Sequence, residues 1–171
     1  MKPALATLTI VVLAMWGLKR YYADAPVDDL RWMLAPTAGL VTAASGVPFE
    51  RQDGEGYVSR ARRFVIAKAC AGINFMIAAF GMVAWTLRRR ARSAIAAALV
   101  IAAGFVASYA AAMFVNAARI VAALWLADHP VRFMAPSQVH RLEGIACYFA
   151  GLVLLCELVR RLDASIERRT T

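Results

Sequence analysis

The chain has 171 residues, 61% of them hydrophobic, and a formal net charge of +9. Its mean hydropathy of +0.58 is too high for an ordinary soluble domain. The charges sit in short blocks between long uncharged stretches, which is typical of a polytopic membrane protein and argues against nucleic-acid binding. The cysteine count is odd, without C-x-x-C, and no histidine has metal-ligand spacing, so we expect no disulfide framework, metal or cofactor.

The first apolar run begins at Pro3 and is closed by the basic pair Lys19-Arg20. Its length is marginal for a membrane span. A run of this kind can also form the apolar core of a signal peptide, but no convincing small-x-small cleavage motif follows it. We therefore favour a first transmembrane helix over residues 3–20 and keep the signal peptide as the alternative.

Residues 20–68 form the one substantial polar segment of the sequence. Asp28-Asp29 indicates a helix start, and Pro36 is expected to interrupt the apolar run that follows. Further along, the extended residues of 47–58 flank a turn-rich stretch, Asp53-Gly54-Glu55-Gly56, and this pattern predicts a β-hairpin. The segment is predicted to be a small extracytoplasmic part of the protein.

Three further apolar spans are predicted at residues 69–87, 94–119 and 141–159, with Ser93 as the N-cap of the middle one. A short polar link around residues 128–140 separates the last two. The sequence thus predicts an all-α membrane protein. It is expected to be a single integral-membrane domain over residues 1–171, a polytopic bundle of about four transmembrane helices.

Two arginine blocks give the orientation, one at residues 88–92 and one in the tail after residue 159. Short basic loops face the cytoplasm, and an even number of predicted crossings separates these two blocks. Both termini are therefore predicted to be cytoplasmic, with residues 20–68 and the 128–140 link outside. Eight basic residues in 19–68 oppose this orientation, but long loops translocate largely regardless of charge.

Three polar residues in apolar surroundings fall near the outer face in this topology. Cys70 lies 18 residues before Arg88, which is about 27 Å along a helix. His140 lies 20 residues before Arg160, or about 30 Å, and the hydrocarbon core is about 30 Å thick. Arg119 is about 40 Å beyond the first arginine block along its helix, a height that tilt would lower.

Depth also separates Cys70 from the other two cysteines. Cys147 lies seven residues deeper than His140, and Cys156 is only four residues from the cytoplasmic Arg160. Of the three thiols, Cys70 is therefore the candidate for chemistry at the outer face.

Each of the three residues has a structural interpretation when taken alone. A cysteine in an apolar helix usually packs, and an arginine beside a span usually reaches the headgroups. The structural interpretation suits Arg119 least, because its neighbours are apolar and a guanidinium there needs a partner. Asn116, one turn away on the same face, is a supporting candidate, and Asn74 is a second.

The three residues together favour acyl transfer. A thiolate at Cys70 would attack a peptide carbonyl, and His140 would hold or deliver the proton of the departing amine. Arg119 would stabilise the negative charge of the tetrahedral intermediate. The sequence therefore predicts a catalytic site made of Cys70, Arg119 and His140.

At these residues the chain resembles the exosortase/archaeosortase family of membrane transpeptidases, most closely the short exosortase K type. The matching pieces are Ala-Cys-Ala-Gly-Ile at 69–73, Asn-Ala-Ala-Arg-Ile at 116–120, and His140 with Gly144. The outer segment is also similar, with Ala-Pro-Thr at 35–37. Each motif is short, but their order, spacing and shared depth make the combination fairly specific over roughly residues 30–160.

The resemblance implies a cysteine protease/transpeptidase of the bacterial inner membrane that sorts exported proteins. Its substrates would carry a C-terminal tail: a short motif such as Pro-Glu-Pro, an apolar span and a basic cluster (PEP-CTERM). It also implies Cys70, Arg119 and His140 as the catalytic residues, with transfer to an acceptor nucleophile that the sequence does not identify. The chain is shorter than the larger family members and has fewer spans.

The sequence is also compatible with two other functions. In the first, the chain is a non-catalytic membrane scaffold or assembly subunit, and Arg119 and Asn116 only hold helices together. The second is a transporter, which is less favoured because no span shows paired acids or a clearly broken helix. A scaffold should tolerate the loss of the Cys70 thiol, whereas a thiol enzyme should not.

Overall fold

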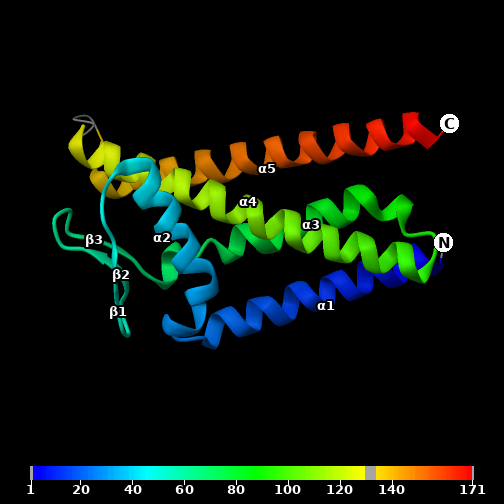
Figure 1. Cartoon of the computed structure of the whole chain (residues 1–171), viewed down its shortest axis with the longest axis horizontal. Helices are drawn as coiled ribbons and strands as arrows, with labels where there is room; N and C mark the ends of the chain where they lie inside the picture. The colour runs from blue at the N-terminus through cyan, green and yellow to red at the C-terminus, as the bar shows by residue number, and fades with distance from the viewer. Residues whose placement is uncertain (1, 130–133, 171) are drawn as a thin grey trace. The chain divides into compact units, whose positions relative to one another are not determined.

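The computed structural model describes residues 2–129 and 134–170. Within them the chain forms five α-helices, drawn in Figure 1: α1 (Lys2–Asp24), α2 (Arg31–Ser45), α3 (Ile73–Leu87), α4 (Ala94–Asp128) and α5 (Pro136–Thr170). Three short strands and three one-turn 3-10 helices lie between them. These are β1 (Glu50–Gln52), β2 (Gly56–Ser59), β3 (Phe64–Ile66), η1 (Asp28–Leu30), η2 (Lys68–Cys70) and η3 (Arg88–Arg90).

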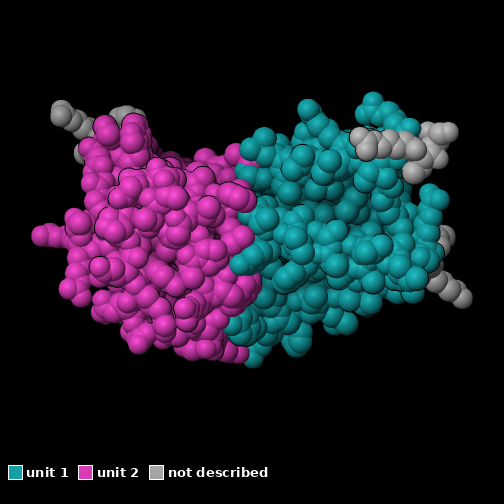
Figure 2. Space-filling view, in the orientation of Figure 1, with its two compact units in different colours: residues 1–23, 74–112, 151–171 teal, residues 24–73, 113–150 magenta. Residues whose placement is uncertain are grey.

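The chain divides into two compact units, coloured separately in Figure 2. Unit 1 comprises Met1–Ala23, Asn74–Ala112 and Gly151–Thr171, and unit 2 comprises Asp24–Ile73 and Met113–Ala150. The long helices α4 and α5 each contribute residues to both units. All the candidate catalytic residues belong to unit 2.

Among the described residues, three helical stretches are long and apolar enough to cross a membrane: Lys68–Arg90, Ala94–Asp128 and Pro136–Arg168. Large apolar side chains on these stretches are exposed, with 63–71% of the surface of Leu99, Phe114 and Leu154 uncovered. Such exposure suits a protein whose solvent is lipid. An all-α, multi-pass membrane protein is thus confirmed. A fourth span at residues 3–20 and the outward position of residues 20–68 stay predictions, because α1 is not among the three stretches.

Helices α4 and α5 extend past the predicted spans 94–119 and 141–159. Each has 35 residues and is therefore about 52 Å long, against a hydrocarbon core of about 30 Å. Hydropathy marks only the part of a helix that lipid surrounds, so it misses the ends. The predicted N-cap is confirmed, since Ser93 Oγ accepts the amide of Ala96 at 3.2 Å. Residues 130–133 of the predicted polar link lie outside the described residues.

In unit 1 the side chain of Phe80 belongs to a buried apolar cluster. It clusters with Val11 and Ala84, against which Met15 and Ile101 pack. Aromatic packing extends the cluster, because Phe105 meets Phe80 edge-on with ring centroids 5.9 Å apart. An ion pair between Arg90 of η3 and Asp163 of α5 joins the arginine block to the last helix.

In unit 2 the expectation that Pro36 interrupts its helix is wrong, because α2 runs through it from Arg31 to Ser45. Proline removes one backbone donor, so α2 lacks the hydrogen bond that residue 36 would otherwise donate. The buried side chains of Met33, Leu34 and Val41, each 0–1% exposed, hold the helix in place. The predicted helix start at Asp28-Asp29 is confirmed as η1, which leads directly into α2.

The predicted hairpin is confirmed: β1 and β2 pair antiparallel, with Arg51 opposite Tyr57. A third strand, β3, pairs with the other edge of β2 and was not predicted, since it has only three residues and follows an arginine-rich stretch. Two polar contacts fix this sheet within unit 2. Asp28 Oδ2 accepts the Gly54 amide at 3.0 Å, and Arg62 pairs with Asp128 at the end of α4.

Candidate active site

Cys70 ends the one-turn helix η2, three residues before α3 begins. Its amide donates to the carbonyl of Ala67 at 2.8 Å, and its side chain is partly exposed. Gly72 then takes the left-handed conformation, with φ of +70°, which turns the chain into α3. A Cβ at this position would lie 3.2 Å from the side chain of Asn116, so glycine also allows the Cys70 turn to approach α4.

Asn116 joins the Cys70 turn to both long helices. Its side chain is fully buried, and its Nδ2 donates to the backbone carbonyl of Cys70. Its Oδ1 accepts the hydroxyl of Tyr148 from α5 at 2.9 Å and lies 3.5 Å from Nη1 of Arg119. Because the donor end faces a carbonyl and the acceptor end faces two donors, only one orientation of the amide satisfies these contacts.

Arg119 continues the network toward His140. Nη1 donates to the hydroxyl of Tyr148 at 3.1 Å, and Nη2 lies 3.2 Å from Nε2 of His140. Its Nε is buried without an acceptor among the described residues. Gly144 makes room for the side chain, because a Cβ there would be 3.3 Å from that Nε. The guanidinium can therefore lie close against the backbone of α5.

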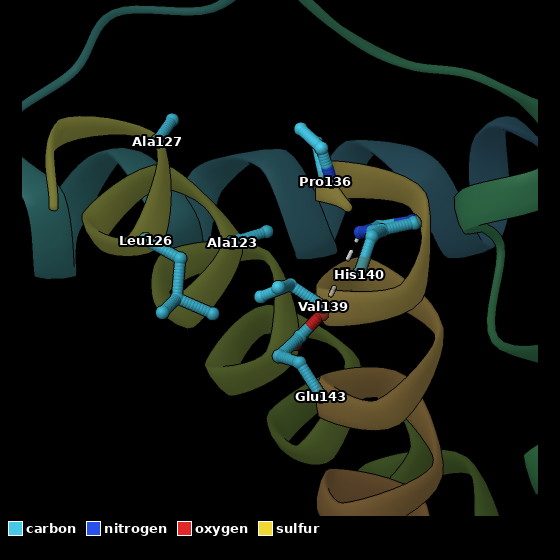
Figure 3. A pocket seen from close by; sticks show the side chains of 7 residues that line it. All are labelled: Ala123, Leu126, Ala127, Pro136, Val139, His140 and Glu143. Atoms are coloured by element: carbon cyan, nitrogen blue, oxygen red, sulfur yellow. Dashed lines mark ion pairs between the residues drawn. The ribbon is translucent and has the colours of Figure 1, made fainter. Parts of the chain in front are cut away.

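The contact with Arg119 decides the tautomer of His140. A guanidinium carries only donors, so Nε2 of the ring must be the acceptor and Nδ1 must carry the proton. Nδ1 lies 3.6 Å from Oε2 of Glu143, one turn along α5. Figure 3 shows this pair at one side of a cavity of about 280 Å³, whose other lining residues are apolar: Ala123, Leu126, Ala127, Pro136 and Val139.

Cys70 is connected to Arg119 and Tyr148 through Asn116, which contacts the Cys70 backbone carbonyl and both of those side chains. A thiol, a guanidinium and an imidazole therefore belong to one cluster, although 70 residues of sequence separate the first from the last. Such a set can perform nucleophilic acyl transfer.

Comparison with protein families gives a match to the model described as Transmembrane exosortase (Exosortase_EpsH), over residues 1–156. The chain belongs to the transmembrane exosortase family. This confirms the resemblance at the level of the family, whereas the exosortase K type stays a prediction. Comparisons with curated proteins and with solved structures found no match. Membership supports a membrane transpeptidase role in the sorting of exported proteins.

The structure brings four of the five predicted site residues of this exosortase-family chain together: Cys70, Asn116, Arg119 and His140. Asn74, the fifth, lies on α3 in unit 1, where it is exposed and accepts Nζ of Lys19 at 2.7 Å. The catalytic roles of Cys70, Arg119 and His140 stay predictions.

The other histidine and the other cysteines lie elsewhere or serve other contacts. His129 stacks on Trp125 at the end of α4, with ring centroids 4.5 Å apart. Cys156 lines a separate cavity in unit 1. Cys147 is nearer to the cluster than its depth suggested, since its Sγ lies 3.8 Å from Oε1 of Glu143.

Sequence reasoning missed Tyr148 and Glu143. Tyr148 holds the oxygen of Asn116 and the guanidinium of Arg119 in one place. Both missed residues lie on the His140 side of α5, Glu143 three positions and Tyr148 eight positions after His140. Polar residues on that face of an otherwise apolar span were the available signal.

Replacing Asn116 should lower the free energy of unfolding more than replacing Asn74 does. Asn116→Ala removes the donor to the Cys70 carbonyl and the acceptor of two other side chains, which should cost about 1–3 kcal/mol in the free energy of unfolding. Asn74→Ala removes one exposed hydrogen bond and should change it by less than about 0.5 kcal/mol. Denaturant unfolding of both variants in detergent measures the difference, and equal losses would contradict the role given to Asn116.

Proposed function

We propose that this chain is a membrane cysteine transpeptidase that cleaves the C-terminal sorting tail of exported proteins at the outer face of the bacterial cytoplasmic membrane. The observation that carries the proposal is the polar face of α4, where Asn116 binds the Cys70 turn and Arg119 contacts His140. Family membership supports the same class of reaction. The substrate would carry a short recognition motif, an apolar span and a basic cluster.

The first step forms the nucleophile. In the observed contact the lone pair of His140 Nε2 accepts from Arg119, so this contact opens as Nε2 takes the proton of the Cys70 thiol. The imidazolium then presents a donor and a positive charge to the guanidinium of Arg119, so the contact between them cannot re-form. Proton transfer thus releases Nη2 of Arg119 for a new acceptor.

That acceptor is the substrate. The thiolate of Cys70 attacks the carbonyl carbon of the scissile peptide, a C–S bond forms, and the carbonyl π electrons move to oxygen. Arg119 donates to the resulting oxyanion, and Tyr148 and Asn116 hold the guanidinium in place. When the intermediate collapses, the C–N bond breaks and His140 gives its proton to the departing amine of the tail, leaving a thioester on Cys70.

The second half of the reaction needs an acceptor nucleophile, either an amine or water. The acceptor attacks the thioester carbonyl and loses its proton to His140. The C–S bond then breaks, and the Cys70 sulfur takes the proton back from the imidazolium. An amine gives transfer to a new partner, and water gives hydrolysis.

In the orientation we propose, the two arginine blocks and both termini face the cytoplasm and the Cys70 cluster faces outward. The order of basic blocks and apolar spans supports this orientation. Reporter domains fused after Arg92 and within the β1–β2 turn distinguish the two sides of the membrane. An external signal after Arg92 would overturn the proposed position of the site.

Loss of the Cys70 thiol should abolish cleavage. Cys70→Ala leaves the backbone carbonyl that Asn116 binds, so the variant should insert at normal levels while the uncleaved precursor accumulates. Cys156→Ala is the matched control, because Cys156 lies in unit 1. This variant should cleave at the rate of the unchanged protein. Co-expression with a tailed exported protein, scored by mass spectrometry of its C-terminus, measures both. Normal cleavage by Cys70→Ala would favour the non-catalytic scaffold instead.

Lysine should not replace Arg119. The guanidinium contacts Tyr148 through one terminal nitrogen and His140 through the other, and a single ammonium group cannot hold this fork geometry. Arg119→Lys should therefore lose a factor of about 100 to 1000 in cleavage rate at normal expression, as expected for one missing oxyanion donor. The same substitution at the exposed Arg141 is the control. A near-normal rate in Arg119→Lys would leave Arg119 as an interfacial anchor.

A further inference from the structure

Glu143 is the acid that faces His140 and is almost completely buried. Only 7% of its side chain is exposed, against 55% for His140. Its Oε2 has no hydrogen-bond partner among the described residues, although it lies 3.6 Å from Nδ1 of the histidine. Figure 3 shows the two side chains on the same face of α5, joined by this contact.

A buried carboxylate is rare unless neighbouring groups compensate its charge. The groups that face Glu143 are Arg119 from α4, and His140 and Cys147 from its own helix. The Cys147 thiol donates to Oε1 of Glu143. The two terminal nitrogens of Arg119 contact Tyr148 and His140. Nδ1–H of His140, 3.6 Å away, is the donor that faces Oε2.

We infer that Glu143 is the positioning residue of His140. This inference rests on the proposed function, in which His140 takes and returns a proton at Nε2. The carboxylate keeps the other ring proton on Nδ1 and thereby leaves Nε2 free to accept. It also offsets the imidazolium charge at the moment when the contact with Arg119 is lost. A base held by a third group in this way is the usual arrangement of nucleophilic acyl-transfer sites.

The arrangement differs from an ordinary ion pair between neighbours on a helix surface. Both members of such a pair are exposed to solvent, and the pair contributes little to stability. Here both side chains line the cavity, but the histidine is exposed and the carboxylate is almost completely shielded from solvent. Burial strengthens the interaction with a charged ring and excludes water as an alternative partner for Oε2.

The test is a double-mutant cycle between Glu143→Gln and His140→Ala in the full chain. If Glu143 acts through His140, Glu143→Gln should lower kcat for tail cleavage by about 10- to 100-fold with KM unchanged. In the His140→Ala background the same substitution should have no further effect. Cys70 alkylation by iodoacetamide, followed by mass spectrometry of the Cys70 peptide, gives the same cycle without substrate.

Controls separate positioning from a loss of structure. Glu157→Gln makes the same change on the same helix at an exposed ion pair with Arg161 and should leave kcat and the alkylation rate unchanged. Glu143→Asp keeps the charge at a greater distance and should recover part of the rate that Glu143→Gln loses. If Glu143→Gln folds poorly, the cycle is measured with Glu143→Asp.

The outcomes also separate this inference from the proposed function. Equal slowing by Glu143→Gln with and without His140 would overturn the positioning role, as would a Glu143→Gln rate equal to that of Glu157→Gln. In either case Cys70→Ala would still be inactive. Normal cleavage by Cys70→Ala would instead overturn the proposed function itself.

Discussion

The arrangement of unit 2 depends on the side-chain amide of Asn116. The amide is fully buried between apolar helices, where an unpaired polar group is costly. Its one donor contact fixes the carbonyl of Cys70, and its oxygen fixes Tyr148 and Arg119. A buried network of hydrogen bonds that joins a turn to two helices restricts how these elements can be arranged. The Cys70 turn cannot shift relative to α4 without breaking it.

The same constraint sets the electrostatics of the cluster. Arg119 and Glu143 bring opposite charges into apolar surroundings, and the His140 ring lies in contact with both. Charges interact more strongly there than in water, so a guanidinium held in a fixed place can stabilise a developing oxyanion effectively. Glycines at positions 72 and 144 permit the close approaches on which this compact cluster depends.

Much of the fold could be predicted because lipid imposes simple rules. Hydropathy found the helices at residues 69–87, 94–119 and 141–159, although it missed their polar ends, and turn residues found the β1–β2 hairpin. The predicted helix break at Pro36 was wrong because tertiary packing of α2 outweighs the loss of one backbone donor. β3 was missed because three residues are too few for a pattern.

The candidate site could be predicted in part. Depth along each helix placed Cys70, Arg119 and His140 at one level, since helical rise is regular. Depth does not tell which face of a helix points toward a neighbour. Asn74 was therefore grouped with the site although it contacts Lys19, and Tyr148 and Glu143 were not recognised as partners of Arg119 and His140.

The central claim is that Cys70 carries the cleaved protein as a thioester. Hydroxylamine, added to membranes during cleavage of a tailed substrate, tests it directly because it attacks a thioester faster than water does. Mass spectrometry of the new C-terminus should then find a hydroxamate, which is absent with the Cys70→Ala variant. A product that carries only a free carboxylate in excess hydroxylamine, released at the same rate as without it, would contradict a thioester intermediate.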